Sequence, residues 1–331
     1  MMTQNIEFCG LLQKSLIAAA QQAETKKSDA REPRVINRVW PTEASAVTPV
    51  GIIGRCRRST FYSQRNISTT QNDMNSLGRF QAGRDIEEWV RNLTTVSGTQ
   101  HAHSIKIRYP NPYNDKLIIS GEIDLIYKFG DKYVGGEIKS SYGYQFHSRV
   151  FPKSTVPGLP KEANLLQTLL YLYYLKHVDT SLGVDSFIIT YLDRGSMEIM
   201  HHMIELSDKM VPIINGVTME NIDDYGNPVY NTPGINEKKT HDKLVTCEFN
   251  LRNVFERFAE IYDYHESGLL IPRDYEPLYT DDMVETKYRA GEISKTAYAN
   301  YTEGRVAQLC DSDCNWCSYR TKCLKDDGII I

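Results

Sequence analysis

The stretch Gly121–Tyr142 reads GEIDLIYKFGDKYVGGEIKSSY. Apolar and β-branched residues dominate the run from 117 to 129 and the shorter run from 132 to 138, as is typical of two strands. Gly130 and Asp131 lie between the two runs and are typical of a tight turn. The sequence therefore predicts a β-hairpin, around which the rest of the chain is expected to be organised.

Three charged residues, Asp124, Glu137 and Lys139, lie inside these predicted strands. Successive side chains of a strand point to opposite faces, so Glu137 and Lys139 share one face and Ile138 lies on the other. Two carboxylates from neighbouring strands suit Mg²⁺, which prefers a few carboxylates and keeps several waters, and such an ion can activate a water against a phosphodiester. The alternative is an edge hairpin whose charges face solvent.

A helix is expected before the hairpin, from about Arg79 to Leu93. Its apolar residues recur at helical spacing and predict a buried stripe of Ile86, Trp89, Val90 and Leu93. Glu87 lies off that stripe, one turn after Gly83. Taken alone, it is equally well an exposed glutamate among the neighbouring acids Asp85 and Glu88.

A second helix is expected after the hairpin, at 161–177, where EANLLQTLLYLYYLKH carries leucines on nearly every side and should be buried against the sheet. Gln167 and Tyr171 stand one turn apart on this helix, so their polar ends reach the same place. The alternative is a buried pair that only satisfies its own hydrogen bonds. Strands at 104–109 and 186–192 complete a mixed sheet.

These motifs together resemble the PD-(D/E)xK nuclease superfamily. The first part of the superfamily's motif, its aspartate, corresponds to Asp124 at the end of G-E-I-D. The second part of the motif corresponds to E-I-K, which starts at Glu137. Gly83-x-x-x-Glu87 and the Q-x-x-x-Y spacing of the second helix are similar to further motifs of the RecB-like branch. The resemblance covers roughly residues 50 to 205 and 300 to 325, with the motifs in the family's order.

The resemblance implies a role for each motif residue. Asp124, Glu137, the Ile138 carbonyl and Glu87 would hold one or two Mg²⁺ or Mn²⁺ ions, and Glu87 stands where a histidine is common in this branch. Lys139 would orient the attacking water and stabilise charge in the transition state. Gln167 and Tyr171 would position DNA or the active site.

Four of the seven cysteines lie near the C-terminus in CDSDCNWCSYRTKC, at Cys310, Cys314, Cys317 and Cys323. Closely spaced thiolates can surround one soft metal, so this spacing alone favours a structural Zn²⁺ held by all four. An odd cysteine count with this clustering also argues for a reducing compartment rather than for disulfides.

The resemblance changes this ligand set. Iron–sulfur nucleases related to RecB, including the CRISPR-adaptation exonuclease family and the AddB helicase–nuclease subunit, use one cysteine before the nuclease core and three after it as C-x2-C-x5-C. Cys314, Cys317 and Cys323 have that spacing, and Cys56 lies where the lone cysteine should. The resemblance thus implies a [4Fe–4S] cluster that clasps the two ends of the core, with Cys310 left over.

Composition sets wider bounds on the chain of 331 residues. The formal net charge of −4 gives no global basic signature, so DNA must be met by a local patch, for which the basic residues around the lone cysteine are candidates, namely Arg55, Arg57, Arg58 and Arg65. Those arginines could instead only pack beside a cluster loop. No apolar run reaches the roughly 18 residues of a membrane span, and the N-terminus lacks a secretory signal. A cytoplasmic protein, or one in the host cytoplasm if viral, is expected.

Four regions are predicted. Residues 1–50 would form an N-terminal helix at about 6–23 and a connector, 51–205 an α/β restriction-endonuclease-like core, 206–249 a polar insertion, and 250–331 a helical region with the cysteines. Within the last region, helices are expected at 250–267 and over 281–309 with a break near Gly291.

The expected function is a metal-dependent DNA nuclease. The resemblance favours an exonuclease acting on DNA ends in recombination, repair or CRISPR-type processing, with DNA and proteins of those processes, or of replication, as partners. Two alternatives stay open at this point: a structure-specific endonuclease on the same fold, and a non-catalytic DNA-binding or assembly subunit. The intact Asp124, Glu137 and Lys139 argue against the second alternative.

Overall fold

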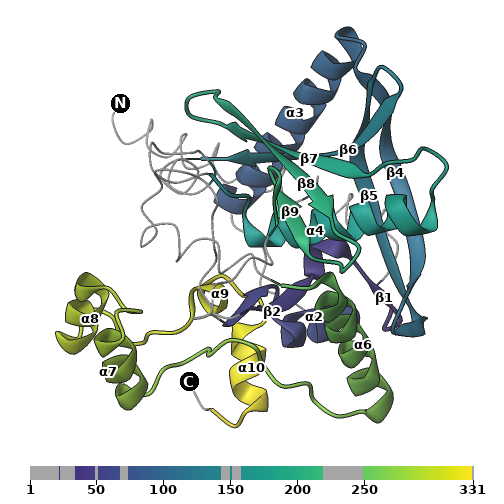
Figure 1. Cartoon of the computed structure of the whole chain (residues 1–331). Coiled ribbons are helices and arrows are strands. Elements are labelled where there is room, and N and C mark those ends of the chain that lie inside the picture. Colours follow the sequence, from purple (N-terminus) through teal and green to yellow (C-terminus); the bar gives the residue numbers. More distant parts are fainter. Residues whose placement is uncertain are drawn as a thin grey trace.

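The computed structural model describes residues 22, 34–48, 51–67, 74–142, 150, 158–218 and 249–329. Within them the chain is a mixed α/β protein with a central mixed sheet flanked by helices (Figure 1). The helix expected at 6–23 lies outside the described residues apart from Gln22, which is helical. No helix in these ranges is long and apolar enough to cross a membrane.

The described part of the sheet has eight strands, in the order β1-β5-β6-β7-β8-β9-β10 with β4 beside β5. Their bounds are β1 Arg38–Val39, β4 Gln100–Asn111, β5 Asn114–Phe129, β6 Lys132–Ser141, β7 Ser186–Asp193, β8 Ile199–Leu206, β9 Pro212–Ile214 and β10 Val217–Thr218. The pairs β1–β5 and β6–β7 are parallel, and the other neighbours are antiparallel. The predicted hairpin is confirmed as β5–β6, and Gly130 in its turn has a φ of 62° that favours glycine.

Two further strands, β8 and β9, were not predicted from the sequence. β8 carries two successive histidines, and His202 is fully buried with a ring nitrogen 3.1 Å from the Val150 carbonyl. β9 lies in the segment expected to be a polar insertion, where the short run VPII at 211–214 pairs with β8. Residues up to Thr218 therefore extend the sheet, and 219–248 lie outside the described residues.

The helices surround the sheet and a smaller pair of strands, β2 (Ser45–Thr48) and β3 (Gly51–Gly54). Their bounds are α2 Arg57–Gln64, α3 Met74–Val96, α4 Glu162–Tyr173, α6 Leu251–Ser267, α7 Asp281–Arg289, α8 Lys295–Thr302, α9 Ser312–Asn315 and α10 Arg320–Asp326. A 3-10 turn, η1 (Pro41–Glu43), precedes β2, and a π-helical turn, η3 (Tyr174–Val178), follows α4. The helix predicted at 250–267 is confirmed, and the segment predicted at 281–309 forms α7 and α8 with the break at Gly291 but ends at Thr302, so its last residues are not helical.

Helix α4 fills the larger hydrophobic core on one face of the sheet. Its leucines are buried, as predicted, against residues of β5 and β7 and against α6. Four apolar residues of α6 are buried there too, namely Val254, Phe258, Ile261 and Tyr262. Asn250 caps the start of α6 by accepting a hydrogen bond from the Arg252 N–H, and Gly268 at its end has a φ of 70°.

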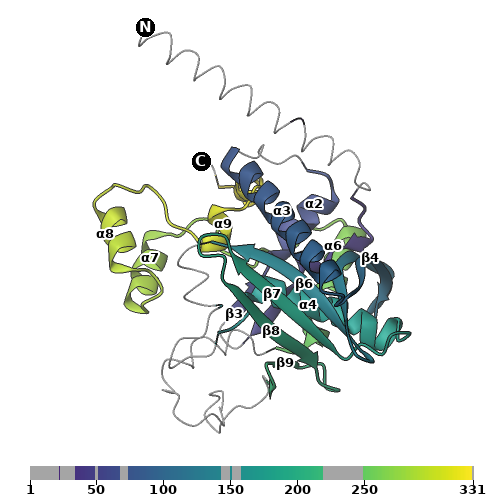
Figure 2. The ribbon, with the colours of Figure 1, turned by 90° about the horizontal axis from the view of Figure 1, so that it is seen from above.

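Helix α3 covers the other face with a smaller cluster, in which Val90 packs with Leu125 and Ile138 (Figure 2). The predicted stripe of α3 is wrong in part, because Trp89 is 41% exposed and Leu93 is 46% exposed. Among the described residues, α3 is the one helix that packs on this face, so residues at the edge of its apolar stripe remain in contact with solvent.

Candidate active site

The two central strands part at the charged residues. Pairing between β5 and β6 ends at Leu125 and Gly136, and the next position in that register sets Asp124 opposite Glu137. The Ile138 N–H donates to Asp124 Oδ2 at 2.8 Å and bridges the fork between the strands. The charge of Glu137 raises the pKa of Asp124, so the two carboxylates lie near each other although the strands are no longer paired there.

The backbone is also irregular on the other side of Asp124. The pairing of β4 with β5 skips Ser104, whose φ is 53°, between the pairs His103–Leu125 and Ile105–Ile123. The register of the two strands is unchanged across this gap, so the irregularity is a local change of the backbone at Ser104 and Asp124.

Glu137 is the most buried charge at the fork, with 1% of its surface exposed. Its Oε1 forms an ion pair with the Lys139 ammonium, which lies on the same face of β6 as the alternation predicts. Its Oε2 is buried and, among the described residues, has no hydrogen-bond partner. A buried carboxylate oxygen without a partner is costly, and a divalent cation is one group that would satisfy it.

Burial and mutual repulsion raise the pKa values of both carboxyls. For Asp124, desolvation is the largest cause of the rise, Glu137 and Glu87 add to it, and Lys139 opposes it. For Glu137, desolvation again dominates and Lys139 is the main opposing charge. Desolvation alone would lower the pKa of Lys139, but Glu137 and Asp124 outweigh it and raise that pKa. The carboxylates at the fork thus carry more negative charge than Lys139 neutralises, and a bound cation would stabilise their ionised forms.

Helix α4 brings Gln167 and Tyr171 to this place. The Gln167 Nε2 donates to the Tyr171 hydroxyl at 3.1 Å, and both side chains are buried. The Gln167 amide also lowers the pKa of Glu137 by favouring its charged form. Gly121 of β5 allows this approach, because a Cβ there would lie 2.9 Å from Tyr171 Cε1.

Glu87 on α3 lies near the fork without joining it. Its charge raises the pKa of both Asp124 and Glu137, but its own Oε1 is 3.1 Å from the Arg91 guanidinium. Gly83, one turn earlier, lies over β6, where a Cβ would be 3.7 Å from Ser140 Oγ. Across the described ranges, no three His, Cys, Asp or Glu side chains are arranged to hold a metal ion as they stand.

Asp124→Asn is expected to stabilise the metal-free protein at neutral pH. A raised folded-state pKa means that stability is gained when the carboxyl is protonated, below its unfolded pKa, and lost as the pH rises through the folded pKa. Asparagine removes the charge and keeps an oxygen for the Ile138 N–H. We expect the free energy of unfolding in EDTA to rise by about 1–2 kcal/mol, measured by denaturant titration.

The gain should shrink as the pH falls into the acid range, where the native Asp124 is already neutral. Asp131→Asn, in the exposed turn of the same hairpin, is the matched control and should change little. A variant less stable than the native protein at every pH would mean that the Asp124 charge is favourable in the fold.

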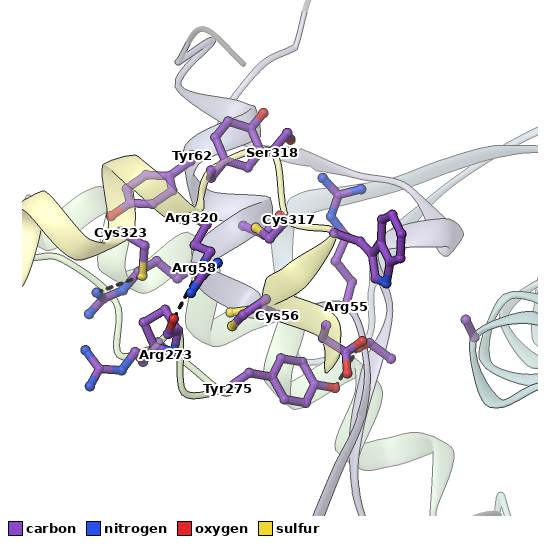
Figure 3. A pocket seen from close by; sticks show the side chains of 18 of the residues that line it. Arg55, Cys56, Arg58, Tyr62, Arg273, Tyr275, Cys317, Ser318, Arg320 and Cys323 are labelled. Carbon is purple, nitrogen blue, oxygen red and sulfur yellow. Dashed lines mark hydrogen bonds between the residues drawn. The ribbon is translucent and has the colours of Figure 1, made fainter. Parts of the chain in front are cut away.

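A second site is a cavity of about 430 Å³ between α2, the start of α4 and the C-terminal segment. Cys56, Cys314, Cys317 and Cys323 line it, and Figure 3 shows the labelled Cys56, Cys317 and Cys323 around this space. Cys56 is the residue before α2, and the other three come from α9, the turn after it and α10. Cys310 does not line the cavity, and its Sγ lies 3.0 Å from Asn315 Oδ1.

The four thiols influence one another across the cavity. Burial raises the pKa of Cys314, and Cys56 and Cys317 are the next largest causes. Burial raises the pKa of Cys323 too, Arg58 opposes that rise, and Cys56 adds to it. These thiols come from opposite ends of the sequence and lie close enough to repel each other once deprotonated.

A half-buried ion pair and several hydrogen bonds join α2 to the C-terminal segment beside the cavity. Arg58 donates to Asp327 Oδ1 at 2.7 Å, to the Ile271 carbonyl at 2.8 Å and to Cys323 Sγ at 3.5 Å. The Tyr62 hydroxyl donates to Asp326 Oδ2 at 2.6 Å. Neither aspartate was predicted to belong to this site, because no local pattern in the sequence relates them to α2.

The proposed phosphate contacts of the arginines near Cys56 need correction. Arg57 is bound to the fully buried Asp274 through its backbone N–H at 2.7 Å and its Nε at 2.9 Å, and Arg58 is buried as described. Arg65 lies over the Phe61 ring, 4.3 Å from its centroid. Arg57 and Arg58 are therefore held inside the fold, whereas Arg65 is exposed and stays a candidate phosphate contact, and Arg55 lines the cavity.

Comparisons with known proteins add little to this geometry. No family model matches the sequence, and no curated protein matches it. Among solved structures, the crystal structure of SSO0001 is similar at 13% sequence identity and a TM-score of 0.35, covering 57% of this chain and 76% of that one. A likeness at this TM-score carries no argument about fold family or activity.

Proposed function

We propose that this protein is a metal-dependent DNA nuclease of the PD-(D/E)xK superfamily, in the RecB-like branch. The observation that carries the proposal is the fork, where Asp124 lies opposite Glu137 with Lys139 on the same face and a buried Glu137 oxygen lacks a partner. A surface hairpin with solvated charges would not bury a carboxylate in this way. The donor set of two carboxylates suits Mg²⁺ or Mn²⁺.

A bound Mg²⁺ or Mn²⁺ would supply an activated water and neutralise charge on the phosphate. Asp124, Glu137 and the Ile138 carbonyl are the groups that would hold it, and Glu87 would join them by exchanging its pairing with Arg91 for the ion. Lys139, kept protonated by the two carboxylates, would hold the attacking water in line and stabilise the charge that develops on the phosphate. Gln167 would orient Glu137 through its amide.

For the cysteine cavity we propose an iron–sulfur cluster held by Cys56, Cys314, Cys317 and Cys323. These four thiols face one volume, whereas the zinc alternative requires Cys310, whose thiol lies outside it beside Asn315. Buried thiols with raised pKa values favour a group that binds them as thiolates and compensates their charge.

The preferred substrate in this proposal is a DNA end, which rests on the resemblance to recombination and CRISPR-type exonucleases. The test is digestion of end-labelled single-stranded and double-stranded DNA, beside covalently closed circular DNA, with Mg²⁺, Mn²⁺ or EDTA. We expect metal-dependent shortening from ends and no cut in the closed circle. Cutting of the circle would make the protein an endonuclease, and no cleavage of any substrate by anaerobically purified protein would leave a non-catalytic DNA-binding role.

Gln167→Ala and Tyr171→Phe are expected to reduce turnover more than they reduce thermal stability. Each removes a polar group beside Glu137, while the leucines of α4 keep the helix in place. We expect roughly tenfold or greater losses in the cleavage rate per folded molecule, from a group that orients a catalytic residue. Paired rates and melting temperatures check this. A lower melting temperature with a normal rate would make the pair only a part of the core.

A further inference from the structure

The ammonium of Lys161 lies beside the proposed active site, although no motif includes this residue. Lys161 immediately precedes α4, and its Nζ donates to Ser141 Oγ at 3.3 Å. Its backbone N–H donates to the Tyr191 hydroxyl at 2.9 Å. The start of α4, the helix that carries Gln167, therefore places the side chain of Lys161 against β6, the strand that carries Glu137 and Lys139.

Ser141 and Lys139 share one face of β6. The alternation along a strand puts Glu137, Lys139 and Ser141 on the same side, and Ser140 on the other side lies over Gly83 of α3. Two residues of a strand span about 7 Å. The Lys161 ammonium thus meets the strand at Ser141, one alternation beyond Lys139, on the face of β6 that carries Glu137.

Tyr191 fixes this arrangement from the neighbouring strand. It pairs with Lys139 in the parallel β6–β7 register, and its buried hydroxyl accepts hydrogen bonds from Lys161 N–H and from Asn164 Nδ2 at 2.8 Å. The start of α4 is thereby tied to the position of Lys139. Lys161 itself is half-buried, and its hydrogen bond to Ser141 holds the ammonium beside β6.

We propose that Lys161 binds a backbone phosphate of the DNA next to the one at Lys139, and so positions the strand for cleavage. The inference rests on the proposed nuclease function and adds a residue that sets substrate position. Two cations that meet successive positions on one face of a strand match a polyanion with a charge at every nucleotide, better than they match a single small anion. Lys161 is a positioning residue in this proposal, because it touches DNA away from the reacting atoms.

The experiment measures binding of a fluorescent single-stranded and a fluorescent duplex oligonucleotide to the full chain in EDTA, over a range of salt concentrations. Lys161→Gln removes the charge and keeps a donor for Ser141 Oγ, and Lys161→Arg keeps the charge. We expect Lys161→Gln to weaken binding about tenfold at low salt and to reduce the slope of log K against log salt by about one. Lys161→Arg should restore both quantities.

Lys176→Ala is the matched control, because its Nζ donates to the Leu206 carbonyl at 2.8 Å from the turn after α4 and has no part in the site. It should leave the salt slope unchanged. If Lys161→Gln does not fold, Lys161→Met gives the same test with an apolar chain of similar length.

The outcomes separate this inference from the proposed function. A native protein that cleaves DNA, together with a Lys161→Gln variant of unchanged slope and lower melting temperature, would make Lys161 a structural lysine and overturn the inference alone. A native protein that neither binds nor cleaves either oligonucleotide overturns the nuclease function as well.

Discussion

Lys139→Ala is expected to abolish phosphodiester cleavage while the protein stays folded and binds DNA. Lys139 is the cation that pairs with Glu137 and faces the fork, so its loss removes charge stabilisation in the transition state. A loss of this kind is worth about 3–4 kcal/mol of barrier, or a 10²–10³-fold lower rate. Single-turnover digestion of end-labelled DNA at saturating Mg²⁺ measures it, with the melting temperature as a check on folding.

Lys132→Ala is the matched control, since Lys132 is an exposed lysine at the start of the same strand. Asp124→Asn should also abolish cleavage, because it removes a metal ligand. A Lys139→Ala variant that cleaves at nearly the native rate would refute the catalytic assignment of the fork.

Cys56→Ser is expected to remove the iron–sulfur cluster and to loosen the contact between α2 and the C-terminal segment. Anaerobically purified native protein should be brown and hold about four irons with matching sulfide, as the resemblance implies. Metal-binding free energy is also folding free energy, so the melting temperature of the variant should fall by on the order of 10 °C. Iron and sulfide analysis with a thermal melt measures both effects.

Cys310→Ser tests the opposite ligand set. Cys310 lies only a few residues before the C-x2-C-x5-C cysteines, but its thiol is outside the cavity. Its replacement should leave the iron content and the melting temperature unchanged. A colourless protein with one zinc, which keeps its metal in Cys56→Ser and loses it in Cys310→Ser, would reverse the assignment.

The fold could be predicted best where the signal is local. The β5–β6 hairpin has a glycine turn between two apolar runs, and α4 and α6 have clear helical periodicity. β8 and β9 were missed because their stability depends on pairing with β7 and with each other, which no short pattern reveals. The exposure of Trp89 could not be predicted for a similar reason, because it depends on contacts between separate elements. It is set by how far the sheet extends beneath α3.

The candidate site was predictable where alternation along a strand decides it. The shared face of Glu137 and Lys139 follows from that rule, and the meeting of Gln167 with Tyr171 follows from helical spacing. The end of pairing at Asp124 and the position of Lys161 depend on how separate elements pack, so the sequence alone contains no pattern for them.

Both walls of the cysteine cavity come from distant parts of the chain, and this has a consequence for synthesis. Cys56 precedes Cys314 by roughly 260 residues. A ribosome adding about 5–20 residues per second takes roughly 13–50 seconds to cover that distance. During that time the nascent chain contains Cys56 but not the C-terminal cysteines. Arg58 likewise has no ion-pair partner, because Asp327 has not yet been synthesised. The rate of translation therefore sets how long Cys56 and Arg58 lack the C-terminal residues that surround them in the folded protein.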